Sequence, residues 1–149
     1  MSIFPFINTK LDTDQVTINN LPVFKEFAYD FHNNCLLRKA DGAPYLIEKN
    51  EALKIWIYKA LLTERFIYVA YDTDFGSEIN TLVGQNYNTE ITNSELKRMI
   101  IETLMCNPYL TELNNWNFES QQSGVRVEFD VTTIYGTERI QFVSKGVMT

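Results

Sequence analysis

The first stretch in which hydrophobic and polar residues alternate begins at Glu26. A second apolar run covers residues 35–38, and Asp41 and Gly42 precede a third run at residues 44–47. Asp-Gly favours a tight turn, because glycine tolerates the positive φ that hairpin turns require. The sequence therefore predicts a small antiparallel hairpin. One face of its first strand is aromatic: Phe27, Tyr29 and Phe31.

The middle of the chain changes to a helical period, with apolar residues at i, i+3 and i+4. Asn50 is predicted to cap a first helix that runs to about Thr63, because an Asn side chain accepts a hydrogen bond from a free backbone N–H. The connector at residues 64–76 is rich in β-formers at residues 66–69 and is predicted to run extended until Gly76. The apolar stripe of the first helix is Leu53, Trp56, Ile57, Ala60 and Leu61. Trp56 and Phe75 are predicted core residues.

Two further helices are predicted before the last third of the chain. Ser77 is the expected cap of a short helix, with Gly84 at the left-handed position after its end. Thr92 and Glu95 have the spacing of a capping box for a third helix, which Pro108 terminates. The apolar positions of these helices are Ile79, Leu82 and Val83, and then Leu96, Met99, Ile100, Thr103 and Leu104.

The last third is predicted to form three strands, at residues 110–118, 125–132 and 139–143, with a turn at residues 135–137. Along the second strand the apolar residues alternate with charged or hydroxyl residues. We expect the hairpin of residues 125–143 to lie at an accessible edge of the sheet, because one face can pack on helices while the backbone edge stays free. The inward residues are predicted to be Val125, Val127, Phe129, Val131, Ile140 and Phe142.

These elements predict an α+β fold in the order β-β-α-α-α-β-β-β, with helices packed on a mostly antiparallel sheet. The chain of 149 residues has the length of one domain, which we assign to residues 25–149. Residues 1–24 have no sustained period and are predicted to form an extended N-terminal arm. The arm is either ordered only on a partner or lies as a strap on its own domain, and its sequence leaves both alternatives open.

The composition limits the kinds of partner that the protein would bind. A net charge of −6 and a pI near 4.8 argue against nucleic acid or an anionic membrane as the main partner. No stretch has the roughly 20 apolar residues of a membrane span. Cys35 and Cys106 are the two cysteines, and we expect two buried, reduced thiols, with one disulfide between them as the alternative.

Residues that would support catalysis or metal binding are few. His32 is the single histidine and has no evident partner for base catalysis or metal binding. Asp72 and Asp74 begin a stretch similar to a calcium loop, but the glutamate that closes such a loop is missing. Glu64 with Asp72 or Asp74 forms a possible carboxylate pair for glycoside cleavage. With 19 acidic residues such a pair arises easily, so we expect no catalytic residue, no metal and no cofactor.

Several short motifs, taken in order, resemble those of the XkdS-like proteins of contractile phage tails and phage-tail-like particles. The resemblance covers roughly residues 27–142, and these proteins are relatives of a small baseplate-wedge family once described as lysozyme-like. The motifs are the Asp41-Gly42 hairpin, residues 51–56, Thr63-Glu64-Arg65-Phe66, Asp74-Phe75-Gly76-Ser77-Glu78, Leu82-Val83-Gly84-Gln85 and Asn107-Pro108-Tyr109.

The resemblance implies a structural baseplate-wedge component with a sheath-interlocking, handshake-like domain. It would join the baseplate to the first sheath ring and help to initiate sheath assembly by strand addition. The implied partners are the tail sheath protein and other wedge proteins in a six-fold assembly, built in the bacterial cytoplasm and retained in the particle. The alternative is a tail-associated muramidase that cleaves peptidoglycan.

Two regions are the expected partner contacts. The wider family carries a Glu-Pro-Arg motif at its contact with other wedge proteins, in the turn after the long helix. The sequence Asn107-Pro108-Tyr109 keeps only the proline of that motif. The edge of the C-terminal hairpin is the expected contact with the sheath, through Arg126, Arg139 and Gln141.

Overall fold

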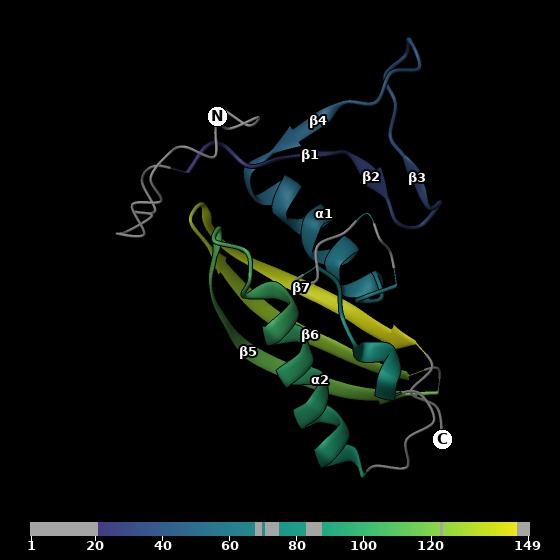
Figure 1. Cartoon of the computed structure of the whole chain (residues 1–149), viewed down its shortest axis with the longest axis vertical. Helices are drawn as coiled ribbons and strands as arrows, with labels where there is room; N and C mark the ends of the chain where they lie inside the picture. Colours follow the sequence, from purple (N-terminus) through teal and green to yellow (C-terminus); the bar gives the residue numbers. More distant parts are fainter. Residues whose placement is uncertain (1–20, 68–69, 71–74, 83–87, 123, 146–149) are drawn as a thin grey trace, which may run out of the picture.

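The computed structural model describes residues 21–67, 70, 75–82, 88–122 and 124–145. Helices α1 and α2 lie on one side of a three-stranded antiparallel sheet, and a hairpin of short strands lies next to α1 (Figure 1).

The α+β class is confirmed. The predicted order with three helices is wrong, because the middle segment forms only a short 3₁₀ helix, η2. The elements are β1 (Lys25–Phe27), β2 (Tyr29–Asp30), β3 (Cys35–Leu36), β4 (Leu46–Glu48), α1 (Lys49–Leu62), η2 (Ile79–Leu82), α2 (Thr89–Leu104), β5 (Leu110–Gln121), β6 (Gly124–Thr133) and β7 (Gly136–Lys145).

The predicted hairpin forms, but as two short antiparallel ladders: β1 pairs with β4 and β2 with β3. Ala28 lies at their junction, where its N–H donates to Tyr45 O and its carbonyl accepts from Leu37 N, each at 3.0 Å. The segment between β3 and β4 protrudes from the hairpin (Figure 1). Its turn contains Gly42 at a φ of 86°, as the Asp-Gly pair predicts.

Helix α1 buries the stripe that its sequence predicts, except that Trp56 is half-buried at the edge of the core. The Trp56 ring lies 6.0 Å from that of Phe75, which is also half-buried. The predicted cap is wrong: Glu48 is the N-cap residue and makes no side-chain cap bond. Asn50 lies inside the helix, where its Oδ1 accepts a hydrogen bond from Thr133 Oγ1 in β6. A tertiary contact has therefore replaced the local one.

Helix α2 also begins at a different residue from the one predicted. Asn88 is its N-cap, and the Asn88 side chain accepts from Ile91 N at 2.9 Å. Thr92 is buried within the helix, and Glu95 forms an ion pair with Arg98 at 2.9 Å, so the predicted capping box does not form. The predicted apolar stripe is confirmed, since all five of its residues are buried: Leu96, Met99, Ile100, Thr103 and Leu104.

The three C-terminal strands form one sheet in the order β5-β6-β7. β6 is central and its residues alternate, with every second side chain buried against the helices. The inward set matches the prediction in full: Val125, Val127, Phe129, Val131, Ile140 and Phe142. Only β7 of the predicted hairpin is an edge strand, because β5 covers the other side of β6. A bulge in β5 near Asn115, whose φ is 54°, bends that strand beside Trp116.

The ends of the connector after α1 meet in a small clasp. Glu64 and Ser77 form an isolated parallel bridge, with Ser77 N donating to Thr63 O at 2.8 Å and Arg65 N donating to Ser77 O at 3.0 Å. Ser77 is not a helix cap as predicted, because its hydroxyl donates to Leu61 O at 2.9 Å. The expected extended run is wrong for residues 65–67, which form a turn. Ile79 and Leu82 of η2 are buried as predicted, whereas Val83 and Gly84 lie outside the described residues.

Gly76 makes this clasp sterically possible, and replacing it tests the clasp. Its φ is 104°, and an added Cβ would lie 2.9 Å from Thr63 O. We expect Gly76→Ala to lower the free energy of unfolding by about 1–3 kcal/mol from backbone strain alone, with the backbone clash adding to it. Chemical denaturation with a fluorescence readout measures the loss.

Gly42→Ala is the matched control. Gly42 also has a positive φ, of 86°, but an added Cβ would meet nothing within 4 Å. The Gly42→Ala variant should lose only the free energy that an alanine needs to adopt the left-handed backbone conformation, about 1–2 kcal/mol. Equal losses for the two variants would contradict a tightly packed clasp.

Candidate partner-binding surfaces

A ladder of charged residues covers the face of the sheet that points away from the helices. Glu128 on the central strand accepts from Arg126 Nη2 at 2.9 Å and from Arg139 Nη2 at 3.3 Å. Arg139 also reaches Asp130 at 2.9 Å, and Gln141 lies opposite Glu128 in the β6–β7 register. Arg126, Arg139 and Gln141, the three residues predicted to contact the sheath, therefore share one face.

The ladder holds its charges in place through mutual hydrogen bonds. The pKa of Asp130 is lowered, first by a hydrogen bond from the Asn115 side chain and then by Arg139. The pKa of Arg139 is raised, mainly by its hydrogen bond to Asp130. A carboxyl whose pKa is lowered by folding stabilises the fold above its unfolded pKa, and that contribution is lost as the pH falls through the lowered value. The Asp130–Arg139 pair therefore favours the charged forms of both groups.

The outer edge of β7 has no strand partner within the part of the chain that the structure describes. Helix α1 reaches the beginning of β7, where Lys54 pairs with Glu138 at 2.8 Å. Further along, Arg139, Gln141 and Val143 are exposed, while Ile140 and Phe142 between them are buried. The accessible part of the edge is therefore the later half of β7.

The predicted contact at residues 107–109 lies at the turn between α2 and β5. Asn107 is buried, and its side-chain oxygen accepts from Tyr109 N at 2.9 Å. Tyr109 is half-buried, and its hydroxyl donates to Pro22 O at 2.7 Å. Burial of this phenol raises its pKa, and Tyr135 adds to that rise. Pro108 is exposed. Two of the three residues thus have structural contacts, and none belongs to the charged ladder.

Residues in the turn after α1 form an exposed apolar surface that the sequence did not predict. Phe66 and Ile67 expose 65% and 59% of their surface, well above the fraction usual for large apolar side chains. Phe66 also has a φ of 69°, which is rare for an aromatic residue, and Arg65 lies over its ring at 5.0 Å. A hollow of about 310 Å³ beside them is lined by residues that include Glu64, Ser77 and Asn80. The one available signal was the run of β-formers, which indicated a strand.

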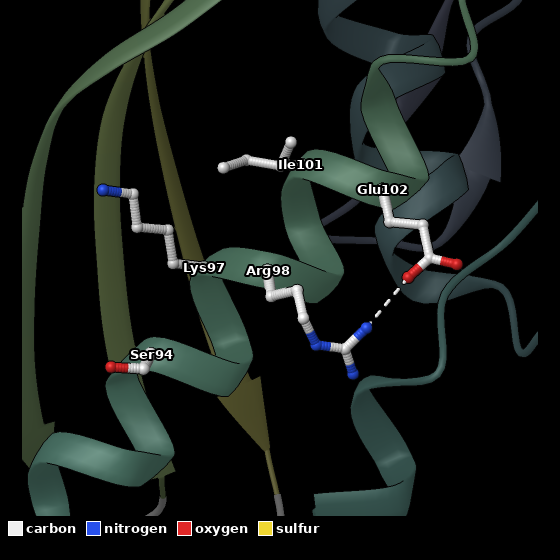
Figure 2. Close-up of a pocket in the computed structure, with 5 residues that line it drawn as sticks. All are labelled: Ser94, Lys97, Arg98, Ile101 and Glu102. Atoms are coloured by element: carbon white, nitrogen blue, oxygen red, sulfur yellow. Dashed lines mark hydrogen bonds and ion pairs between the residues drawn. The ribbon is translucent and has the colours of Figure 1, made fainter.

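A second hollow, of about 460 Å³, lies on the outer surface of α2 (Figure 2). Arg98 turns toward Glu102, with Nη1 and Oε2 3.1 Å apart, and Lys97 points to the other side of the helix. The lining side chains spread outward from one helix and do not converge on a common point in Figure 2. This hollow is an open helix surface rather than a site for a small ligand.

The candidate catalytic residues are not brought together where the structure describes them. Glu64 accepts a hydrogen bond from the Asn80 side chain, and Arg65 pairs with Glu102 at 3.0 Å. Asp72 and Asp74, the other carboxylates of the hypothetical pair and the start of the calcium-like stretch, lie outside the described residues. His32 is exposed in the turn between β2 and β3. Among the described residues, no three His, Cys, Asp or Glu residues are grouped as metal ligands would be.

Both cysteines are exposed and no disulfide joins them, so the prediction of buried thiols is wrong. Cys35 lies in a two-residue strand of the hairpin, and Cys106 follows the end of α2. Neither position faces the core between the helices and the sheet.

The helices that the structure describes include none long and apolar enough to cross a membrane.

Comparison with known proteins agrees with the motifs in the sequence. Residues 25–136 match the family described as contractile injection system sheath initiator. The chain is also 28% identical over 118 residues to phage-like element PBSX protein XkdS of Bacillus subtilis (strain 168), covering 78% of this chain and 79% of XkdS. The family match spans the hairpin, both helices and the sheet as far as the β6–β7 turn, and it identifies a structural component that initiates the sheath of a contractile tail. The chain therefore belongs to the contractile injection system sheath initiator family.

Proposed function

We propose that the protein is a baseplate-wedge component that joins the baseplate to the first sheath ring, and that a sheath strand adds to the edge of β7. The observation that carries the proposal is the exposed later half of β7 at the end of the sheet. An edge strand presents backbone N–H and C=O groups that template another strand. Family membership supplies the partner, since a sheath initiator interacts with the tail sheath protein.

The packing of β7 suits an edge that accepts another strand. Ile140 and Phe142 are buried in the core, so the strand is anchored to both helices through the sheet. β6 continues the ladder along the whole length of β7, from Thr133 opposite Gly136 to Gly124 opposite Lys145. An added strand would therefore extend a platform that is already ordered.

The charged ladder is placed to discriminate among incoming strands. Gln141 and Val143 are exposed on the same face as Arg126 and Arg139. Side chains of an added strand on that face would lie beside the charged ladder, since alternate residues of paired strands share a face. Backbone pairing would supply the affinity for the sheath strand, and the charged ladder would set the register of that strand.

The baseplate side of the proposal rests on a different surface. The exposed Phe66 and Ile67 beside a hollow have the character of a protein-contact surface, because large apolar side chains in contact with water favour burial. We propose that other wedge proteins bind there and at exposed Pro108, in a six-fold assembly built in the bacterial cytoplasm. The sheath and the baseplate would then contact separate parts of the fold.

A proline at position 141 tests the β7 edge. A two-residue turn closes the β6–β7 hairpin between Thr133 and Gly136. Because hydrogen-bonded and non-hydrogen-bonded pairs alternate from that closing pair, we expect Gln141 N–H to point away from β6. Gln141→Pro should remove an outward donor, leave the β6–β7 ladder intact, and yield baseplates with naked tubes or unattached sheath in electron micrographs of purified particles.

Gln141→Ala is the control, because it removes the same side chain and keeps the N–H. It should give normal sheathed particles. The melting temperature of each isolated variant establishes that the domain still folds. Normal sheathed particles from Gln141→Pro would refute strand addition at this edge.

The alternative function is peptidoglycan cleavage, and it has a direct test. Glu64 is hydrogen-bonded to Asn80 and is the one described carboxylate of the hypothetical pair. We expect no release of soluble fragments when purified protein is incubated with cell walls. Turnover above buffer that disappears in both Glu64→Gln and Asp74→Asn would establish a muramidase and overturn the purely structural function.

A further inference from the structure

An apolar groove runs between the N-terminal hairpin and helix α1. Its volume is about 380 Å³. The Phe31 ring contacts two others that line the groove: its centroid lies 4.8 Å from that of Tyr29 and 5.3 Å from that of Tyr58. Leu37 at its rim is 39% exposed. The residues that line the groove are Ala28, Tyr29, Phe31, Leu37, Tyr45, Ile47, Glu51, Lys54, Ile55 and Tyr58.

We propose that the first seven residues of the same chain dock in this groove. The segment Met1-Ser2-Ile3-Phe4-Pro5-Phe6-Ile7 is largely apolar, whereas residues 8–20 are mostly polar. A proline fixes its own φ and disfavours the α region for the residue before it, so a segment that contains proline loses less conformational entropy on docking. Aromatic-lined grooves bind extended, proline-containing segments in several peptide-recognition domains.

The arm is rooted close enough to reach the groove. Tyr109 Oη donates to Pro22 O at 2.7 Å, and Phe24 N donates to Tyr135 Oη at 3.0 Å, which fixes the point where the arm leaves the fold. Phe24 O also accepts from Lys49 N, at 2.9 Å, at the start of α1. From Lys49 to Tyr58 the helix rises about 14 Å, at 1.5 Å per residue. Residues 8–20 span up to about 40 Å when extended, so they suffice as a tether.

The tether also favours this occupant over a free partner. A segment joined by a short flexible linker is present at an effective concentration of the order of millimolar, whatever the concentration of other proteins. Of the two charged residues that line the groove, Glu51 and Lys54, Lys54 is paired with Glu138 at 2.8 Å. The arm therefore lies on its own domain as a strap, and its apolar segment binds in the aromatic groove.

Paramagnetic NMR on the full chain tests the strap. A nitroxide is attached at Ser2→Cys in a chain with Cys35→Ser and Cys106→Ser, both exposed sites. We expect loss of the amide peaks of Tyr29, Tyr45 and Tyr58, while the peak of Gln141 on the sheet persists. Phe4→Ser with Phe6→Ser should restore the lost peaks, and Leu11→Ser with Val16→Ser, which removes apolar residues from the tether, should not.

A matched pair of hairpin variants distinguishes docking in the groove from nonspecific association. Leu37→Lys should restore the peaks, whereas Leu46→Lys should not, because Leu46 is 52% exposed on the same hairpin but does not line the groove. Broadening that is uniform over the protein, or that survives Leu37→Lys, would overturn the proposal. So would broadening in a mixture of labelled and ¹⁵N-enriched unlabelled chains, which indicates exchange between copies. Loss of groove peaks only after sheath or baseplate protein is added would assign the arm to a partner instead.

Discussion

The alternation of β6 is the constraint on which the rest of the structure depends. Its inward residues, from Val125 to Val131, are buried under both helices, and its outward residues carry the charged ladder. A shift of one residue in register would place the charges in the core and the valines in water. This penalty fixes the pairing of β6 with both neighbours, and with it the identity of the two sheet edges.

A sheet fixed in this way can present an edge without losing its own order. β7 has the same alternation as β6, so its side chains are committed to the core or to the ladder, and its outer edge has no strand partner among the described residues. The adjoining face carries both signs of charge in mutual contact, and charged side chains beside an edge oppose unspecific strand pairing. This combination suits the proposed strand addition, because the edge can template one strand while the charges beside it oppose random aggregation.

Polar side chains that look like local caps in the sequence connect distant parts of the fold instead. Asn50 accepts from Thr133, 83 residues away, and Ser77 donates to Leu61 O, 16 residues away. Both links join elements that contribute to the same core. A buried hydroxyl or amide without a partner is costly, so the tertiary neighbours that burial provides take precedence over helix capping. Gly76 allows the second link, because another residue would clash with Thr63 O.

The sequence by itself determined the elements whose period is long and regular. The stripe of α2 and the inward residues of β6 follow directly from repeats of 3.6 and 2, because burial of one face leaves few alternatives. The Asp-Gly turn was equally local, since it depends on one backbone conformation. The tertiary structure alone decided what depends on neighbours distant in sequence. It placed β6 between two strands, exposed Cys35 and Phe66, and buried Asn107. A residue's burial and hydrogen-bond partners are properties of the packed chain, and no short stretch of sequence contains them.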